Sequence, residues 1–170
     1  MSTIDFATTV TPLGTMLLAA RGDALCGAWF EGQRHRPTPD ARWRRRRAAP
    51  VLARAIAELD EYFRGARRRF DLRLAPEGTP FQRAVWDAIA AVPYGATTTY
   101  AALAASAGRP RSVRAAGAAT GRNPLSIFVP CHRIVGARGA LTGYAGGLGR
   151  KRALLDLEHP GAVAPARRAA

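Results

Sequence analysis

The sequence contains little cysteine and no long apolar run. Its two cysteines, Cys26 and Cys131, lie far apart and form no disulfide framework of the kind that staples small secreted domains. No stretch approaches the roughly 20 apolar residues that a membrane-spanning helix needs, and the N-terminus carries no secretory signal pattern. We therefore expect a folded protein of the reducing cytoplasm that does not enter a membrane.

Acidic residues are also scarce. The 170-residue chain has 12 of them against 26 lysines and arginines, which gives a formal net charge of +14, and Lys151 is its one lysine. A surplus of this size favours a polyanionic partner, which is DNA, RNA or an anionic membrane surface. Because Ala, Arg, Gly and Pro are abundant throughout, compositional bias is an alternative explanation for part of the arginine content.

The first half of the chain combines strand and helix signals. Turns that contain Gly or Pro separate three short apolar stretches, which predict strands over residues 4–10, 15–20 and 25–30. Residues 31–50 include the run RWRRRR at 42–47 and are interpreted as a basic loop, which either has a specific task or is simply solvated. Apolar residues recur at helical spacing over 51–63, and alternation over 70–74 predicts another strand.

Helix signals dominate the second half. Thr79 and Gln82 form a capping box in front of a helix whose first turn holds Pro80. Two shorter helices are predicted over 100–107 and 113–121, and the tight turn between them gives the outline of a helix-turn-helix. The second of these helices consists mostly of small residues. It can therefore approach a nucleic-acid groove closely, or it can simply pack tightly against another helix.

Cys131 is the strongest candidate for chemistry. It lies between Pro130 and the pair His132-Arg133, and a neighbouring imidazole and guanidinium can lower the pKa of a thiol and supply a base. Adjacent residues of a strand point to opposite faces, so cooperation with His132 requires a turn, with which Pro130 is consistent. The alternatives are an inert buried cysteine, as we interpret Cys26, and a Cys-His hydrolase. The spacing of cysteines and histidines does not favour a zinc site.

The segment around Cys131 resembles the active-site signature of a known family. The sequence VPCHRIV at 129–135 is similar to the signature of the O6-alkylguanine-DNA alkyltransferases. Further ordered matches lie between Gly78 and Glu158, and they include GTPFQ at 78–82, PYG at 93–95, GRNP at 121–124, LTGYAGGL at 141–148 and LLDLE at 154–158. So many matches in one order make the resemblance specific, although it covers only about half of the chain.

The resemblance implies a catalytic role for four residues. Cys131 is the implied acceptor of the alkyl group. His132 acts through a water to take the thiol proton, and Glu158 orients the imidazole and stabilises its charge. Asn123 braces the turn that carries the cysteine.

The resemblance also implies how the lesion is held. Tyr100 would donate a hydrogen bond to guanine N3 as the purine leaves, and Tyr144 and Ala145 would line the pocket around it. Arg114 would enter the duplex and fill the gap left by a flipped nucleotide. The remaining implied DNA contacts lie on or next to the same helix; they are Ser112, Ala115 and Gly117.

Together these residues imply direct-reversal DNA repair. The expected reaction is a single, irreversible transfer of an alkyl group from O6-alkylguanine, and also from O4-alkylthymine, in duplex DNA to Cys131. The expected fold is α+β, with a ribonuclease H-like unit over 1–76, a winged helix-turn-helix-like unit over 77–160 and a disordered tail over 161–170. We expect a monomer that binds the minor groove without a metal or cofactor. The rival interpretation is a lesion-binding protein without catalysis, which the acceptor cysteine disfavours.

Overall fold

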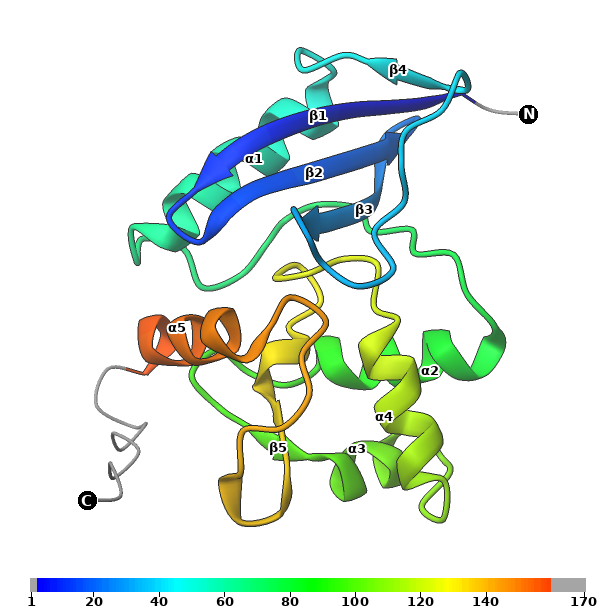
Figure 1. Ribbon diagram of the computed structural model, residues 1–170, viewed down its shortest axis with the longest axis vertical. Coiled ribbons are helices and arrows are strands. Elements are labelled where there is room, and N and C mark those ends of the chain that lie inside the picture. Colours follow the sequence, from blue (N-terminus) through cyan, green and yellow to red (C-terminus); the bar gives the residue numbers. More distant parts are fainter. Residues whose placement is uncertain (1–2, 160–170) are drawn as a thin grey trace.

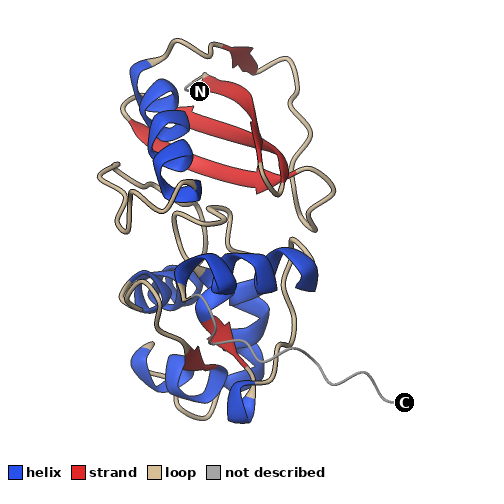
Figure 2. Ribbon diagram, turned by 90° about the vertical axis from the view of Figure 1, so that its left-hand side faces the viewer, coloured by secondary structure: helices blue, strands red, loops and turns tan. Residues whose placement is uncertain are grey.

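The computed structural model describes residues 3–159, which form two units stacked along the long axis of the molecule (Figure 1). The N-terminal unit is a four-stranded sheet with one helix. Its strands are β1 (Ile4–Thr11), β2 (Gly14–Arg21), β3 (Ala24–Phe30) and β4 (Trp43–Arg45), in the order β3-β2-β1-β4. The three strands predicted first are confirmed. Helix α1 (Pro50–Phe63), also as predicted, crosses one face of the sheet (Figure 2).

Both faces of the sheet are covered, and this explains its composition. Met16 and Leu18 face the main core under α1, whereas Leu17 joins a smaller cluster on the opposite face. That smaller cluster is aromatic, with Trp43 of β4 lying 6.0 Å from the ring of Phe6 and 6.5 Å from the ring of Trp29. The sequence of β2 is consequently a nearly continuous apolar run and not an alternating one.

Two predictions for the N-terminal unit are wrong in part. The basic loop contains β4, which pairs in parallel with β1, and Asp5 of β1 forms ion pairs with Arg44 at 2.8 Å and Arg46 at 3.4 Å. The strand predicted over 70–74 does not form; only Leu74 makes a bridge, to Leu25. Its apolar side chains pack against the core from an extended segment, so alternation alone indicated burial and not pairing.

The C-terminal unit is mainly helical. Its elements are α2 (Pro80–Ala90), β5 (Thr98–Thr99), α3 (Tyr100–Ser106), α4 (Val113–Gly121), the 3₁₀ turn η1 (Cys131–Arg133), β6 (Ile134–Val135), the 3₁₀ turn η2 (Ala137–Gly139) and α5 (Leu148–Glu158). Helices α2, α3 and α4 pack on one another, and β5 pairs in parallel with β6. The mixed α+β class is therefore confirmed.

Helix boundaries test the capping predictions. The Thr79 hydroxyl accepts a hydrogen bond from the Gln82 backbone amide while the Gln82 side chain accepts one from the Thr79 amide, so the capping box is confirmed. Helices α3 and α4 lie where they were predicted. Ser112 precedes α4, but its hydroxyl makes no capping hydrogen bond to this helix.

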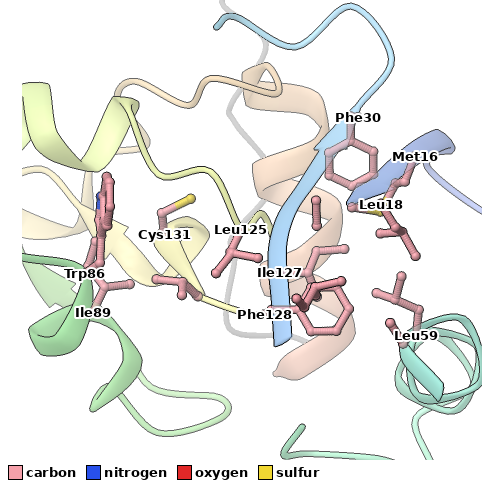
Figure 3. Close-up of a cluster of buried hydrophobic side chains, with 14 of the residues drawn as sticks. Met16, Leu18, Phe30, Leu59, Trp86, Ile89, Leu125, Ile127, Phe128 and Cys131 are labelled. Atoms are coloured by element: carbon pink, nitrogen blue, oxygen red, sulfur yellow. The ribbon is translucent and has the colours of Figure 1, made fainter. Parts of the chain in front are cut away.

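The two units share one hydrophobic core. The segment after α4 rises to the sheet, where the Ala28 amide donates to the Pro124 carbonyl and the Ser126 amide donates to the Ala28 carbonyl. Leu125, Ile127 and Phe128 then lie between two groups of side chains (Figure 3): Trp86 and Ile89 of α2, and Met16, Leu18, Phe30 and Leu59 of the N-terminal unit. This segment leads directly into η1, so the sheet supports the turn that carries Cys131.

Among residues 3–159, no helix is long and apolar enough to cross a membrane. The predicted tail over 161–170 lies outside the described residues.

Candidate active site

Cys131 begins a single 3₁₀ turn. Pro130 precedes it with φ −81° and ψ 63°, so the backbone leaves extended geometry just before the cysteine. This confirms that the cysteine and His132 do not occupy a regular strand. The side chains of Cys131 and His132 are both buried, and their backbones belong to the same short turn.

Asn123 makes hydrogen bonds to the cysteine turn and to the segment before it. Its Nδ2 donates to the Val129 carbonyl at 2.8 Å and to Cys131 Sγ at 3.1 Å, while its Oδ1 accepts from the Leu125 amide at 3.0 Å. All of these groups are buried, so their pairing avoids the free-energy cost of buried polar groups without hydrogen-bond partners. One amide side chain therefore fixes both the loop and the sulfur.

The thiol of Cys131 is neutral at rest. Burial raises its pKa, and this outweighs the opposite effects of the Asn123 hydrogen bond and the positive charge of Lys151. The expectation that neighbouring His and Arg side chains lower the thiol pKa is therefore wrong. Arg133 in particular faces a carboxylate and not the sulfur. Reaction at this sulfur requires a base that removes its proton.

The carboxylate of Glu158, in the last turn of α5, accepts five hydrogen bonds. Its Oε1 accepts from His132 Nε2 at 2.8 Å, Arg133 Nη2 at 2.9 Å and the Tyr62 hydroxyl at 2.7 Å. Its Oε2 accepts from Arg133 Nε at 2.8 Å and the Gly95 amide at 3.4 Å. The predicted pairing of His132 with Glu158 is thus present in the structure.

These contacts set the charge states of the pair. Burial alone would raise the pKa of Glu158, but hydrogen bonds from His132 and Arg133 hold it far below its usual range. The pKa of His132 is lowered, first by burial, although Glu158 opposes that shift. An ionised carboxylate only accepts hydrogen bonds, so Nε2 of the neutral imidazole carries the proton. The other nitrogen, Nδ1, is therefore a free base, and it is buried with no hydrogen-bond partner among the described residues.

A cavity of about 560 Å³ gives access to the sulfur. Cys131 lines it together with the predicted pocket residues Tyr100, Tyr144 and Ala145 and with Gly117 of α4. The hydroxyl of Tyr144 is buried without a hydrogen-bond partner among the described residues. A cavity of this size accommodates a purine base, and the sulfur is consequently buried without being sealed off.

The outer face of α4 carries the other predicted contacts. Arg114 and Ala115 are exposed and do not line the cavity, and Ser112 lies half-buried before the helix. Gly117 is one of the α4 residues that line the cavity, and a Cβ there would lie 3.7 Å from the Tyr100 ring. The predicted residues thus form two groups, one around the sulfur and one on the surface beside the cavity mouth.

Several residues of the site were missed by the sequence analysis. Lys151 is fully buried, and its ammonium donates to the carbonyls of Ile134, Thr142 and Gly143. Burial lowers its pKa to about 8. The sequence did offer one indication, because Lys151 is the one lysine among many arginines. A compact ammonium fits among several carbonyl oxygens better than a planar guanidinium does. For Tyr62, no pattern in the neighbouring sequence indicated a place in the site.

The N-terminal unit also contributes to the cavity wall. Arg34 and His35 line it, and the Arg34 amide donates to the Ala145 carbonyl at 3.1 Å. Among residues 3–159 no three His, Cys, Asp or Glu side chains lie together as a metal site requires.

Comparison with known proteins gives matches to both units. The family model described as 6-O-methylguanine DNA methyltransferase, ribonuclease-like domain, matches residues 4–76, and that of the DNA binding domain matches residues 80–160. Methylated-DNA–protein-cysteine methyltransferase of Methanosarcina barkeri is 45% identical over 148 residues, covering 87% of this chain and 92% of that protein. The Mycobacterium tuberculosis protein of the same name is 42% identical over 160 residues, covering 91% and 92%.

A solved structure extends this likeness to three dimensions. The crystal structure of M. tuberculosis OGT in complex with DNA superposes with a TM-score of 0.83 at 40% sequence identity. The match covers 92% of this chain and 96% of that one, so both units correspond.

Proposed function

The chain belongs to the 6-O-methylguanine DNA methyltransferase family, and from this premise we propose that it repairs DNA by moving an alkyl group from O6-alkylguanine onto the sulfur of Cys131. O4-alkylthymine is the second expected substrate. The observation that carries the proposal is a cysteine sulfur that lines the cavity and is followed in the chain by a buried histidine whose carboxylate partner is ionised.

The buried thiol defines the first step. Because the pKa of Cys131 is raised, the proton must leave as the sulfur attacks, and Nδ1 of His132 is the free base that receives it through a water. The resulting imidazolium is stabilised by Glu158, to which Nε2 already donates at 2.8 Å. This arrangement is a triad-like relay in which the acid stays ionised.

The transfer itself breaks one bond and forms another. The sulfur attacks the alkyl carbon in line with the leaving oxygen, so an S–C bond forms as the C–O bond breaks. The guanine leaves with the electron pair and takes up, through water, the proton that the thiol gave to His132, while the Tyr100 hydroxyl donates to N3 and spreads the developing charge. In the structure this hydroxyl donates to the Thr142 carbonyl at 3.1 Å. It would give up this hydrogen bond to donate to guanine N3. The thioether does not revert, so each molecule acts once.

The cavity requires a flipped nucleotide. The O6-alkyl carbon of a stacked guanine lies inside the duplex, where the sulfur cannot reach it in line. Extrusion costs a few kcal/mol, and less where the lesion already weakens pairing. We assign the walls of the base pocket to Tyr144 and Ala145.

The surface of α4 is the proposed DNA contact. α3 and α4 act as a helix-turn-helix of a winged unit, and the small residues Ala115 and Gly117 let α4 enter the minor groove beside Ser112. Arg114, exposed near the start of α4, fills the space of the flipped nucleotide. The protein acts in the cytoplasm as a monomer and without a cofactor. The two units correspond to residues 1–76 and 77–160.

Mass spectrometry tests the proposal directly. Protein mixed with an oligonucleotide containing O6-methylguanine should gain one methylene mass on the Cys131 peptide, in a 1:1 ratio to repaired base. Cys131→Ala should bind the lesion without gaining mass, and unmethylated oligonucleotide is the blank. An unmodified Cys131 peptide, or more than one repaired base per molecule, contradicts the proposal.

A further inference from the structure

The N-terminal unit reaches the catalytic carboxylate through one side chain. Tyr62 lies in the last turn of α1 and is 1% exposed, and its hydroxyl donates to Glu158 Oε1 at 2.7 Å. The two residues are 96 positions apart in sequence. The reaction described above uses no group of the N-terminal unit, yet this unit contacts the carboxylate oxygen that also pairs with His132.

That oxygen is shared among three donors. Tyr62, His132 and Arg133 all donate to Oε1, at 2.7, 2.8 and 2.9 Å. A carboxylate that accepts more hydrogen bonds is a weaker base, so each added donor reduces the pull of Glu158 on the proton of His132 Nε2. The low dielectric of a buried site strengthens this competition.

Tyr62 is a permanent donor. Burial raises the pKa of its phenol far above the usual range, and the negative charge of Glu158 raises it further. The hydroxyl therefore keeps its proton at every pH at which the protein works. Its effect on Glu158 is constant, which suits a group that sets the basicity of a neighbour.

We propose that Tyr62 is a positioning residue for alkyl transfer: it limits the basicity that Glu158 confers on His132 and thereby keeps the imidazole neutral and ready to take the thiol proton. The inference rests on the proposed function. It assigns the ribonuclease-like unit a part in the chemistry. The hydrogen bond from Tyr62 to Glu158 acts on His132 indirectly, because Glu158 is the carboxylate that pairs with that histidine.

The other charged groups around His132 are accounted for. Within η1 it neighbours Cys131 and Arg133, and from α5 it faces Glu158 and Lys151. The positive charges of Arg133 and Lys151 both lower the pKa of His132. Helix α2 also packs against η1, but its charged residues, Arg83 and Asp87, are exposed. Tyr94 lies close to Glu158, yet its hydroxyl donates to the Leu157 carbonyl at 3.3 Å and not to the carboxylate.

Tyr62→Phe removes the hydroxyl and keeps the ring. Glu158 should then attract the Nε2 proton more strongly, so the pKa of His132 should rise and the acid limb of the transfer rate should move to higher pH. We expect the limb to move by about 0.5–1 pH unit, which is a roughly three- to tenfold slower transfer on the limb, with rates within about twofold of the parent above it. Tyr94→Phe is the matched control, because it deletes a neighbouring phenol that does not touch the carboxylate, and its profile should coincide with that of the parent.

Two measurements on the full chain decide the matter. Single-turnover transfer from a methylated duplex gives the pH–rate profile, and ¹⁵N chemical shifts of His132 give its pKa without any reaction. Coincident profiles for Tyr62→Phe and the parent, or an equal displacement in Tyr94→Phe, would overturn the inference. If the parent fails to methylate Cys131, the proposed function is wrong, whereas the chemical-shift titration still tests the role of Tyr62.

Incorporation of 3-fluorotyrosine at position 62 provides a test with the opposite sign. The fluorinated phenol is a stronger donor of nearly the same shape, so it should lower the pKa of His132 and move the acid limb to lower pH. This variant keeps the buried hydrogen bond and so covers the case in which Tyr62→Phe fails to fold. An unmoved His132 titration in the fluorinated protein contradicts the inference.

Discussion

At the scale of single residues, the site consists of charged groups and a base that are buried in the interior of the protein. Arg133 and Glu158 neutralise each other through two short hydrogen bonds, at 2.8 and 2.9 Å, so the carboxylate can stay ionised in the interior. A buried pair of this kind is costly to break, because the remaining partner keeps its charge without compensation. His132 can remain neutral beside an ionised acid because burial lowers the pKa of its imidazole and because the guanidinium of Arg133 already balances that acid.

His132 should make the stability of the protein dependent on pH. Burial lowers its pKa in the folded chain, whereas in the unfolded chain imidazole ionises near its ordinary value of about 6.5. Below about pH 6.5 the imidazole therefore binds a proton in the unfolded state but not in the folded state. The free energy of unfolding should consequently fall as the pH drops below about 6.5. Urea unfolding at pH 7.5 and pH 5.5 measures this fall, which His132→Gln should reduce. His35→Gln, at an exposed histidine, is the control, and equal falls in the parent and His132→Gln would contradict the prediction.

Lys151 should support the reactivity of Cys131. Its positive charge lowers the pKa of the thiol, and its ammonium holds the carbonyls of Thr142 and Gly143 beside the cavity. Lys151→Met should raise the thiol pKa and slow both methyl transfer and alkylation by iodoacetamide, by about tenfold for each pH unit by which that pKa rises. The measurement is the pH dependence of iodoacetamide labelling in a Cys26→Ser background.

Arg152→Met is the control for this lysine. Arg152 is the next residue of α5, and within residues 3–159 it makes no side-chain hydrogen bond or ion pair. Its replacement should leave the labelling profile unchanged. Slowing of similar size in both variants would show that α5 was merely destabilised and that the ammonium has no electrostatic role.

At the scale of elements, α4 shows what a local pattern can predict. Its bounds followed from composition, and its small residues do face the cavity and the surface, with Gly117 against Tyr100. Cys131 was a candidate from its neighbours alone, and the roles of Asn123 and Glu158 came from the resemblance. In the structure Asn123 donates to Cys131 Sγ and Glu158 pairs with His132, and their roles in the reaction stay predictions.

Contacts between distant segments left no such pattern. Tyr62 occupies an ordinary apolar position of an amphipathic helix, and nothing in α1 indicates that its hydroxyl meets a carboxylate on α5. The segment over 70–74 alternates like a strand, but its pairing is limited to one bridge with Leu25, made by the Arg73 carbonyl and the Ala75 amide. Strand pairing and buried hydrogen bonds depend on the partner segment, which local spacing does not specify.

Arg114 should matter for duplex DNA and not for the chemistry. It is exposed on α4 outside the cavity, so its loss cannot alter the base pocket directly. Arg114→Ala should slow transfer from a methylated duplex by about tenfold or more, because the flipped nucleotide then leaves an unfilled gap. Transfer from free O6-benzylguanine should stay within about twofold. Arg83→Ala on α2 removes an exposed arginine elsewhere and should change neither rate, whereas equal slowing of Arg114→Ala on both substrates contradicts a role in flipping.

At the scale of the whole molecule, the two units depend on each other for their interior. The segment between α4 and η1 has its apolar side chains among those of the sheet and α1, and Phe128 lies 4.6 Å from the ring of Phe70. The hydrogen bond between Gln33 Oε1 and Ser126 Oγ, at 2.9 Å, adds a buried polar link. Neither unit can expose its share of this interface without uncovering the turn that carries Cys131.

The shared core predicts a single unfolding transition. Tryptophans report on both units, because Trp29 and Trp43 lie in the N-terminal sheet and Trp86 lies in α2. In Trp86→Phe the fluorescence follows the N-terminal unit, and in the double variant Trp29→Phe/Trp43→Phe it follows the C-terminal unit. Within each variant the guanidinium midpoint by fluorescence should coincide with that by far-UV circular dichroism, as two-state unfolding requires.

Phe128→Ala tests the cause of this cooperativity. Deleting a buried ring at the junction should lower the unfolding free energy by about 3–5 kcal/mol and move both reporters together, because the cavity weakens a core that both units use. Val10→Ala, at a side chain that is 84% exposed, should shift neither midpoint appreciably. If Phe128→Ala moved the Trp86 signal and left the sheet signal in place, the units would fold independently. The hydrogen bond from Tyr62 to Glu158 would then join two separately stable bodies, and its geometry would no longer be fixed by the core.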